Sequence, residues 1–166
     1  MALLCCLLTT ACTPRKVSIT AVFLDDGHPT AIFHPCGGVR VSGISVTELT
    51  TTSASNSDPG LGWGIANVGS REGHSVAQIR LLATPPGWEL QTTKPGTLLT
   101  AFSVDRTYIV AADTADPTAG NDSSVAFTLR DLRSLTDGEV WAVPKPFAQP
   151  QAMTRDEFRR HAAASC

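Results

Sequence analysis

The chain carries little charge and has no basic field. Only 17% of its 166 residues are charged, and the formal net charge is −2. Proteins that bind nucleic acid, or that are drawn to an anionic membrane surface, need a concentrated positive charge. The composition therefore argues against nucleic acid as a partner and against a membrane contact driven by charge.

The usual signatures of catalysis and metal binding are also missing. No Gly-x-Ser-x-Gly elbow is present for a serine nucleophile, and the glycines at 60–64 precede a predicted strand, whereas a phosphate loop opens a helix. The four histidines do not form paired zinc ligands, and the aspartates at 113–122 do not follow calcium-loop spacing. We therefore expect no enzymatic activity, no cofactor and no bound metal.

What the chain does have is alternation of apolar and polar residues with a period of two, typical of half-buried strands. It is clearest at Tyr108, Val110 and Ala112, and again at Val125, Phe127 and Leu129. The spacer 114–123 is rich in Asp, Asn, Pro and Gly, which favour turns. The stretch 107–130 therefore predicts a long hairpin that forms the middle of a β-sheet.

Shorter alternating stretches separated by turn residues fill most of the remaining chain. We expect strands at 17–24, 30–34, 39–49, 63–67, 77–81, 98–104 and 139–143. Asp25-Asp26-Gly27 predicts a tight turn, and Gly43 predicts a bulge where the apolar phase switches. The pattern predicts an all-β protein, an immunoglobulin-like two-sheet antiparallel β-sandwich with a short C-terminal helix.

The C-terminal segment predicts the helix. Three prolines keep 143–151 extended and out of a central strand. Thr154 and Glu157 have the spacing of a capping box, with Met153 and Phe158 placed as a hydrophobic staple, so the helix should begin at Arg155. Phe158, Ala162 and Cys166 then lie on one stripe that should dock on the sandwich.

The N-terminus carries the strongest functional signal. Residues 2–11 are apolar or hydroxylated and uncharged, and the run is too short to span a bilayer, which needs about 20 apolar residues. It fits the apolar region of a secretory signal better. Leu7 and Leu8 upstream of Ala11-Cys12 resemble the lipobox of bacterial lipoproteins. The resemblance implies cleavage before Cys12 and acylation of its thiol.

Two features depart from that family pattern. Thr9 stands where the family has a branched apolar residue, and no basic residue precedes the apolar run, as a start upstream of Met1 would explain. The alternative interpretation is a buried first strand that contains cysteines. With the lipoprotein interpretation, Cys5 and Cys6 leave with the signal, so Cys36 and Cys166 remain for one disulfide. Two free thiols are the alternative to that bond.

The sequence thus predicts four parts: a signal peptide at 1–11, truncated if the start lies upstream, a lipidated tether at 12–16, a sandwich domain at 17–143, and a Pro-rich crossing with a packed helix at 144–166. We expect a non-catalytic binding or structural module on the extracytoplasmic face of a bacterial membrane. Its partners would be the membrane, through the anchor, and an envelope protein or glycan. An alternative function is a small-ligand or metal carrier that uses His34 and neighbouring loops.

Three tryptophans, Trp63, Trp88 and Trp141, bear on that partner. An exposed tryptophan on a sandwich would suggest a glycan or protein contact. Each lies beside a predicted strand, so core packing is the interpretation we favour.

Overall fold

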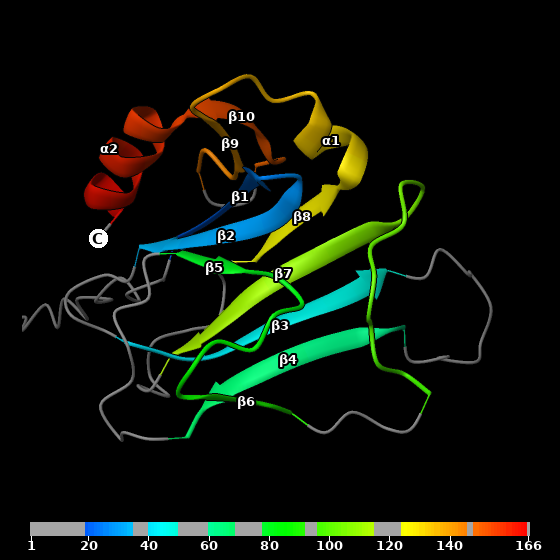
Figure 1. The fold of residues 1–166 in the computed structure, drawn as a ribbon. Coiled ribbons are helices and arrows are strands. Elements are labelled where there is room, and N and C mark those ends of the chain that lie inside the picture. The colour runs from blue at the N-terminus through cyan, green and yellow to red at the C-terminus, as the bar shows by residue number, and fades with distance from the viewer. Residues whose placement is uncertain are drawn as a thin grey trace, which may run out of the picture.

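Alternating sequences form two antiparallel sheets, which Figure 1 shows one above the other. The computed structural model describes residues 19–34, 40–49, 60–68, 78–91, 96–114, 124–145 and 148–165. In the first sheet the strand order is β10 (Gln151–Thr154), β9 (Glu139–Ala142), β1 (Ile19–Asp25), β2 (His28–His34) and β5 (Gln78–Arg80). In the second it is β6 (Trp88–Leu90), β4 (Gly62–Asn67), β3 (Val41–Leu49), β7 (Thr107–Thr114) and β8 (Val125–Thr128).

The local turn chemistry sets the strand register as expected. Asp25 pairs with His28 across a two-residue turn, in which Asp26 and Gly27 have φ angles of 48° and 76°. Two left-handed residues are what a type I′ hairpin requires, and Asp-Gly supplies them. The predicted bulge is also confirmed, because the pairing of β3 with β7 shifts between Val41 and Gly43.

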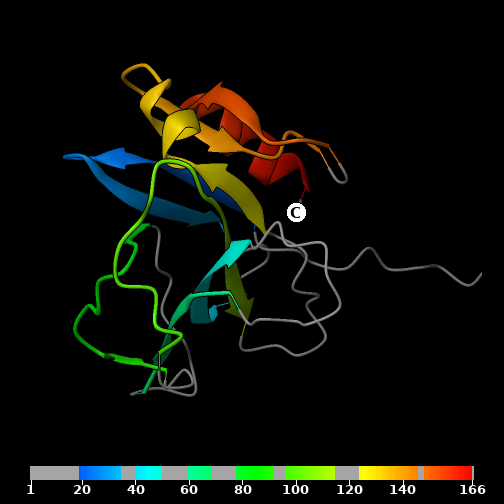
Figure 2. The same cartoon turned by 90° about the vertical axis from the view of Figure 1, so that its right-hand side faces the viewer.

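Two apolar cores hold three layers together. The main core lies between the sheets and includes Phe33, Val41 and Tyr108. A second core lies between the outer side of the first sheet and helix α2 (Arg155–Ser165), as Figure 2 shows from the side. Its buried members are Ala21, Phe23, Val140, Ala142, Met153 and Phe158. The first sheet is therefore covered on both faces.

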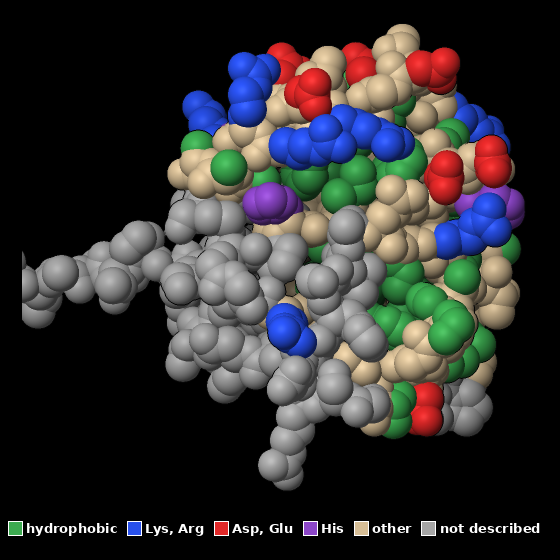
Figure 3. Space-filling model, turned by 60° about the vertical axis from the view of Figure 1, so that its left-hand side comes forward, with side chains coloured by type: hydrophobic (Ala, Val, Ile, Leu, Met, Phe, Trp, Pro, Cys, Tyr) green, Lys and Arg blue, Asp and Glu red, His purple; other side chains and the backbone are tan. Residues whose placement is uncertain are grey.

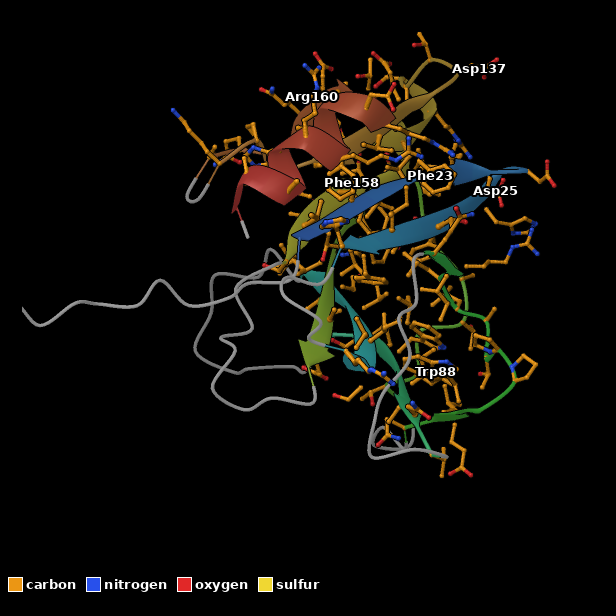
Figure 4. All side chains as sticks on the ribbon, turned by 90° about the vertical axis from the view of Figure 1, so that its left-hand side faces the viewer. Phe23, Asp25, Trp88, Asp137, Phe158 and Arg160 are labelled. Atoms are coloured by element: carbon orange, nitrogen blue, oxygen red, sulfur yellow. The ribbon has the colours of Figure 1, made fainter. Side chains whose placement is uncertain are left out.

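Helix α2 begins where the capping box predicted. The Glu157 carboxylate accepts the Thr154 N–H at 2.8 Å, and the Glu157 N–H donates to the Thr154 hydroxyl at 3.2 Å. Met153 and Phe158 are both buried in the second core, which confirms the staple. Figure 4 shows Phe158 above the strand that carries Phe23. The structure confirms the all-β, two-sheet antiparallel sandwich with a short C-terminal helix.

One predicted strand is absent, and two short strands were not predicted. The stretch 98–104 is no strand, and only Leu98 forms an isolated bridge, to Gly62. Instead Phe102 packs edge to face on Tyr108, and the Ser103 N–H donates to the Tyr108 hydroxyl at 2.7 Å, so the segment closes one end of the core. The short edge strands β6 and β10 were not expected.

The second half of the predicted central hairpin also ends differently. β7 is an interior strand, but the middle strand of its sheet is β3, and β8 is an edge strand. The chain then enters a short helix, α1 (Leu129–Arg133), which starts because Thr128 and Asp131 form a second capping box. Leu129 therefore begins a helix and does not continue the strand.

Candidate binding face

The three predicted modification sites lie outside the described residues. Cys12, Cys36 and Cys166 belong to segments for which no structure is described, so the lipid anchor and the disulfide stay predictions. The described neighbours of the last two do share one end of the molecule. In Figure 1 the last turn of α2 and the end of β2 lie on the same side of the molecule, and the main contacts of α2 are with β9 and β10.

His34, the residue of the alternative carrier function, is the last residue of β2. It is half-buried and pairs with Ile19 of β1. His28 begins the same strand, and six residues of extended chain separate the two by roughly 20 Å. Within the described ranges no three His, Cys, Asp or Glu side chains are grouped so that they could hold a metal ion. His28 therefore cannot share an ion with His34.

The tryptophans serve the core, as expected. Trp63 and Trp88 are buried, with exposed fractions of 4% and 7%. Trp141 is half-buried, and its indole N–H donates to the Ala126 carbonyl at 3.0 Å, which joins β9 of the first sheet to β8 of the second. A glycan contact through an exposed tryptophan therefore has no support in the structure.

The described carboxylates with altered pKa have structural roles. The Thr136 N–H donates to Glu139 at 2.8 Å, and the Thr154 N–H and hydroxyl donate to Glu157. These bonds, from the backbone first, lower the pKa of both carboxyls below the ordinary value of 4.5. Both groups therefore remain ionised at neutral pH, Glu139 in the turn before β9 and Glu157 in the capping box of α2, and are poorly suited to carry protons.

The outer face of the second sheet is the surface that stands out. Successive strand residues point to opposite faces, so the residues that alternate with the buried core share the other face. Cross-strand pairing places Ile109 beside Thr47 and Ala126, and Ser45 beside Gly64 and Ala111. The small-residue face, as we name it, comprises Ser45, Thr47, Gly62, Gly64, Ile109, Ala111 and Ala126.

No member of the small-residue face is charged. The nearest described charges in this register are Asp113 and Glu89, which border the face in the row of Gly43 and Ala66. On the side shown in Figure 3, charged side chains gather in the upper half, around the first sheet and its helices. A sheet face turned to water is normally polar. The lack of charged side chains is instead typical of a surface that contacts another molecule.

Neither described helix lies over the small-residue face. α2 packs on the first sheet, and Leu132 of α1 is part of the main core. Exposure of the face is intermediate to high, with Thr47 exposed and the other six members half-buried. The first sheet has its outer cover in α2, and the described residues give the second sheet no equivalent helix.

Two glycines of this face, both on β4, are required by no close contact within the described residues. A Cβ on Gly62 would meet its nearest atom, the Val46 carbonyl oxygen, at 3.7 Å, and one on Gly64 would meet the Ile44 carbonyl oxygen at 3.6 Å, both ordinary contacts. Neither glycine has a positive φ, and β4 pairs with β3 without a bulge. Glycine inside a strand destabilises it unless another backbone must come close. The glycines therefore indicate an approach from outside.

Comparisons with protein-family models, with curated proteins and with solved structures found no match to this chain. Within the described part of the chain, no helix combines the length and the apolar character that crossing a membrane requires. The candidate binding face was not found from the sequence, because it depends on which strands are neighbours. The usable signal was that Gly62 and Gly64 alternate with Trp63 and Ile65.

Proposed function

We propose that the protein is a lipid-anchored β-sandwich module of the bacterial cell envelope, held by an acylated Cys12 on the extracytoplasmic side of the membrane. It binds a protein partner through the small-residue face and catalyses no reaction. The uncharged outer face of the second sheet, with Gly62 and Gly64 along its β4 side, is the observation that carries the binding role.

The anchor is supported by the residues at 7–12, which resemble a lipobox. The extracytoplasmic side is an oxidising compartment, in which the two remaining cysteines can form a disulfide. A Cys36 to Cys166 bond would link the end of α2 to the end of β2. The bond would close a loop of about 130 residues. For a loop of this size the chain-entropy model predicts that the cross-link stabilises the fold by on the order of 4 to 5 kcal/mol.

The chemistry of the face selects a protein as the partner. It has no charged side chain to attract nucleic acid or an acidic polymer, and no aromatic ring on which a sugar could stack. Its hydroxyls and glycines allow a flat, uncharged backbone to approach closely. An uncharged sheet or extended segment of an envelope protein has the matching shape.

Capture of partners from envelope membranes tests the binding role. The lipid-anchored protein and its Ser45→Arg variant are used as baits, because arginine at this half-buried position projects a long charge over the face. Gln151→Arg, on the exposed start of β10 in the other sheet, is the matched control. We expect a protein that the wild type and Gln151→Arg capture and Ser45→Arg loses.

Two results count against this function. Equal capture by Ser45→Arg and by the control would remove the small-residue face as the contact. A native protein recovered without lipid, in the soluble fraction, would remove the anchor.

A further inference from the structure

On the basis of the anchor proposed above, we infer that the end of the sandwich where β1 begins faces the lipid bilayer and that the opposite end points away from it. The membrane-facing end contains His34, Arg40, Val68, Thr114 and the last turn of α2. The two ends are identified by the strand directions, and the choice between them follows from the length of the tether.

The strand directions place several termini together. Ile19 pairs with His34, so β1 begins where β2 ends. In the second sheet Val41 pairs with Thr114, so β3 begins where β7 ends. Phe33, next to His34, and Val41 belong to the same buried core, and Figure 1 shows the end of β2 and the start of β3 on the left. These starts and ends therefore form one end of the molecule, the near end.

The opposite end carries exposed apolar side chains. Leu49 ends β3, Leu61 precedes β4 and accepts the Glu48 N–H through its carbonyl at 2.8 Å, and Val104 lies just before β7. Their exposed fractions are 40%, 39% and 37%. Exposed apolar residues of this kind would enter a bilayer if they reached one. This opposite end, the far end, is therefore the alternative site of membrane contact.

Tether length decides between the two ends. Only six residues, 13–18, lie between the lipidated Cys12 and Ile19, and the seven Cα-to-Cα steps span at most roughly 25 Å when fully extended. β3 runs for nine residues, so the far end of its sheet lies roughly 26 Å beyond the near end. With the far end on the bilayer, the tether would be stretched to its limit. With the near end on the bilayer, the tether does not need to be fully extended.

Charge does not make the choice. Arg40 lies at the near end together with Asp113 and Glu89, which share one row across the sheet, so these residues give this end no excess of positive charge for an anionic surface. The orientation should therefore persist on vesicles of uncharged phosphatidylcholine. It also keeps Leu49, Leu61 and Val104 out of the lipid, free for contact with other proteins.

Cross-linking from the bilayer surface tests the orientation. The native acylated protein is placed in phosphatidylcholine vesicles that contain a phosphatidylethanolamine with a diazirine on its headgroup, and cross-linked peptides are mapped by mass spectrometry. We expect peptides around His34, Arg40 and Val68 to be labelled several-fold more than those around Leu49 and Val104. A flexible insert of about twenty residues after Lys16 should erase the difference, because the longer chain lets either end reach the lipid.

The outcomes separate this inference from the anchor itself. Intact mass of the recovered protein shows whether Cys12 is acylated. Acylated protein with uniform labelling, or with labelling concentrated on Leu49 and Val104, would overturn the orientation alone. Protein without a lipid on Cys12 would overturn both the anchor and the orientation that depends on it.

Discussion

Gly64 and Gly43 lie on neighbouring strands of the same sheet face and should respond to alanine in opposite ways. At Gly64 the new methyl group makes ordinary contacts, so Gly64→Ala should raise the free energy of unfolding by about 0.5 to 1 kcal/mol. At Gly43 the Cβ would lie 2.8 Å from the Asp113 carboxylate oxygen and 3.3 Å from the Asp113 Cβ, which turning the carboxylate does not relieve, so Gly43→Ala should destabilise the fold. Urea unfolding of both variants measures the difference.

The sign at Gly64 is the informative result. A stabilised Gly64→Ala would mean that folding alone does not require this glycine, as expected if its role is contact with a partner. A loss of stability at Gly64 comparable to that at Gly43 would contradict this account, because the glycine would then be explained by the fold.

Two carboxylates give the stability an acid dependence. Hydrogen bonds from Thr136 and Thr154 lower the pKa of Glu139 and Glu157 below 4.5, so the unfolded chain binds more protons than the folded one in that range. Their contribution is fully present above pH 4.5 and is lost as pH falls through the lowered values. Glu139→Gln/Glu157→Gln, which keeps an acceptor oxygen at each position, should flatten the acid limb of stability against pH.

A carboxylate distant from Glu139 and Glu157 serves as the control for the dependence of stability on pH. Glu89→Gln on edge strand β6 should keep the acid dependence of the wild type. Urea midpoints between pH 3 and 6 follow the change, a window that brackets the ordinary carboxyl values. Equal slopes in the wild type and the double variant would show that Glu139 and Glu157 do not set the acid limb.

At the scale of elements, helix α2 depends on one side chain more than on any of its exposed charges. Phe158 is 2% exposed and fills the second core against the first sheet. Phe158→Ala should lower the free energy of unfolding by about 3 to 5 kcal/mol, from lost burial and the cavity left behind. Arg159→Ala, one residue further on the exposed face, should change it by less than about 0.5 kcal/mol.

Hydrogen exchange locates the effect of Phe158→Ala. Amides of α2 and β10 should lose protection more than those of β3 and β7, because the second core is separate from the core between the sheets. Uniform loss across all strands would show that α2 is not a separate cover but part of one cooperative core.

Sequence reasoning found elements where periodicity and cap chemistry agreed. The Thr154 to Glu157 box was recognised because a staple and an apolar stripe accompany it. The same box at Thr128 and Asp131 was missed, because Leu129 continues the period of the preceding strand. β6 and β10 have only three and four residues, too few to show alternation, and 98–104 showed an apolar pattern that serves an aromatic contact instead.

At the scale of the whole molecule, the two-sheet architecture followed from strand count and turn chemistry, but the neighbour order did not. The pairs β1 with β9 and β3 with β7 join segments more than 50 residues apart, and no local pattern encodes them. The small-residue face exists only because β3 pairs with β4 on one side and with β7 on the other, which brings Gly64, Ser45 and Ala111 into one row. Local pattern therefore identified the inside of the sandwich and not the face proposed for binding.

The central claim is that the molecule is held at a membrane through Cys12. Mass spectrometry of the native protein, extracted from a membrane fraction with detergent, tests it most directly. The account predicts a mature chain that starts at Cys12 and carries the mass of acyl chains on that residue. A soluble protein that retains residues 1–11 and has an unmodified Cys12 would contradict it.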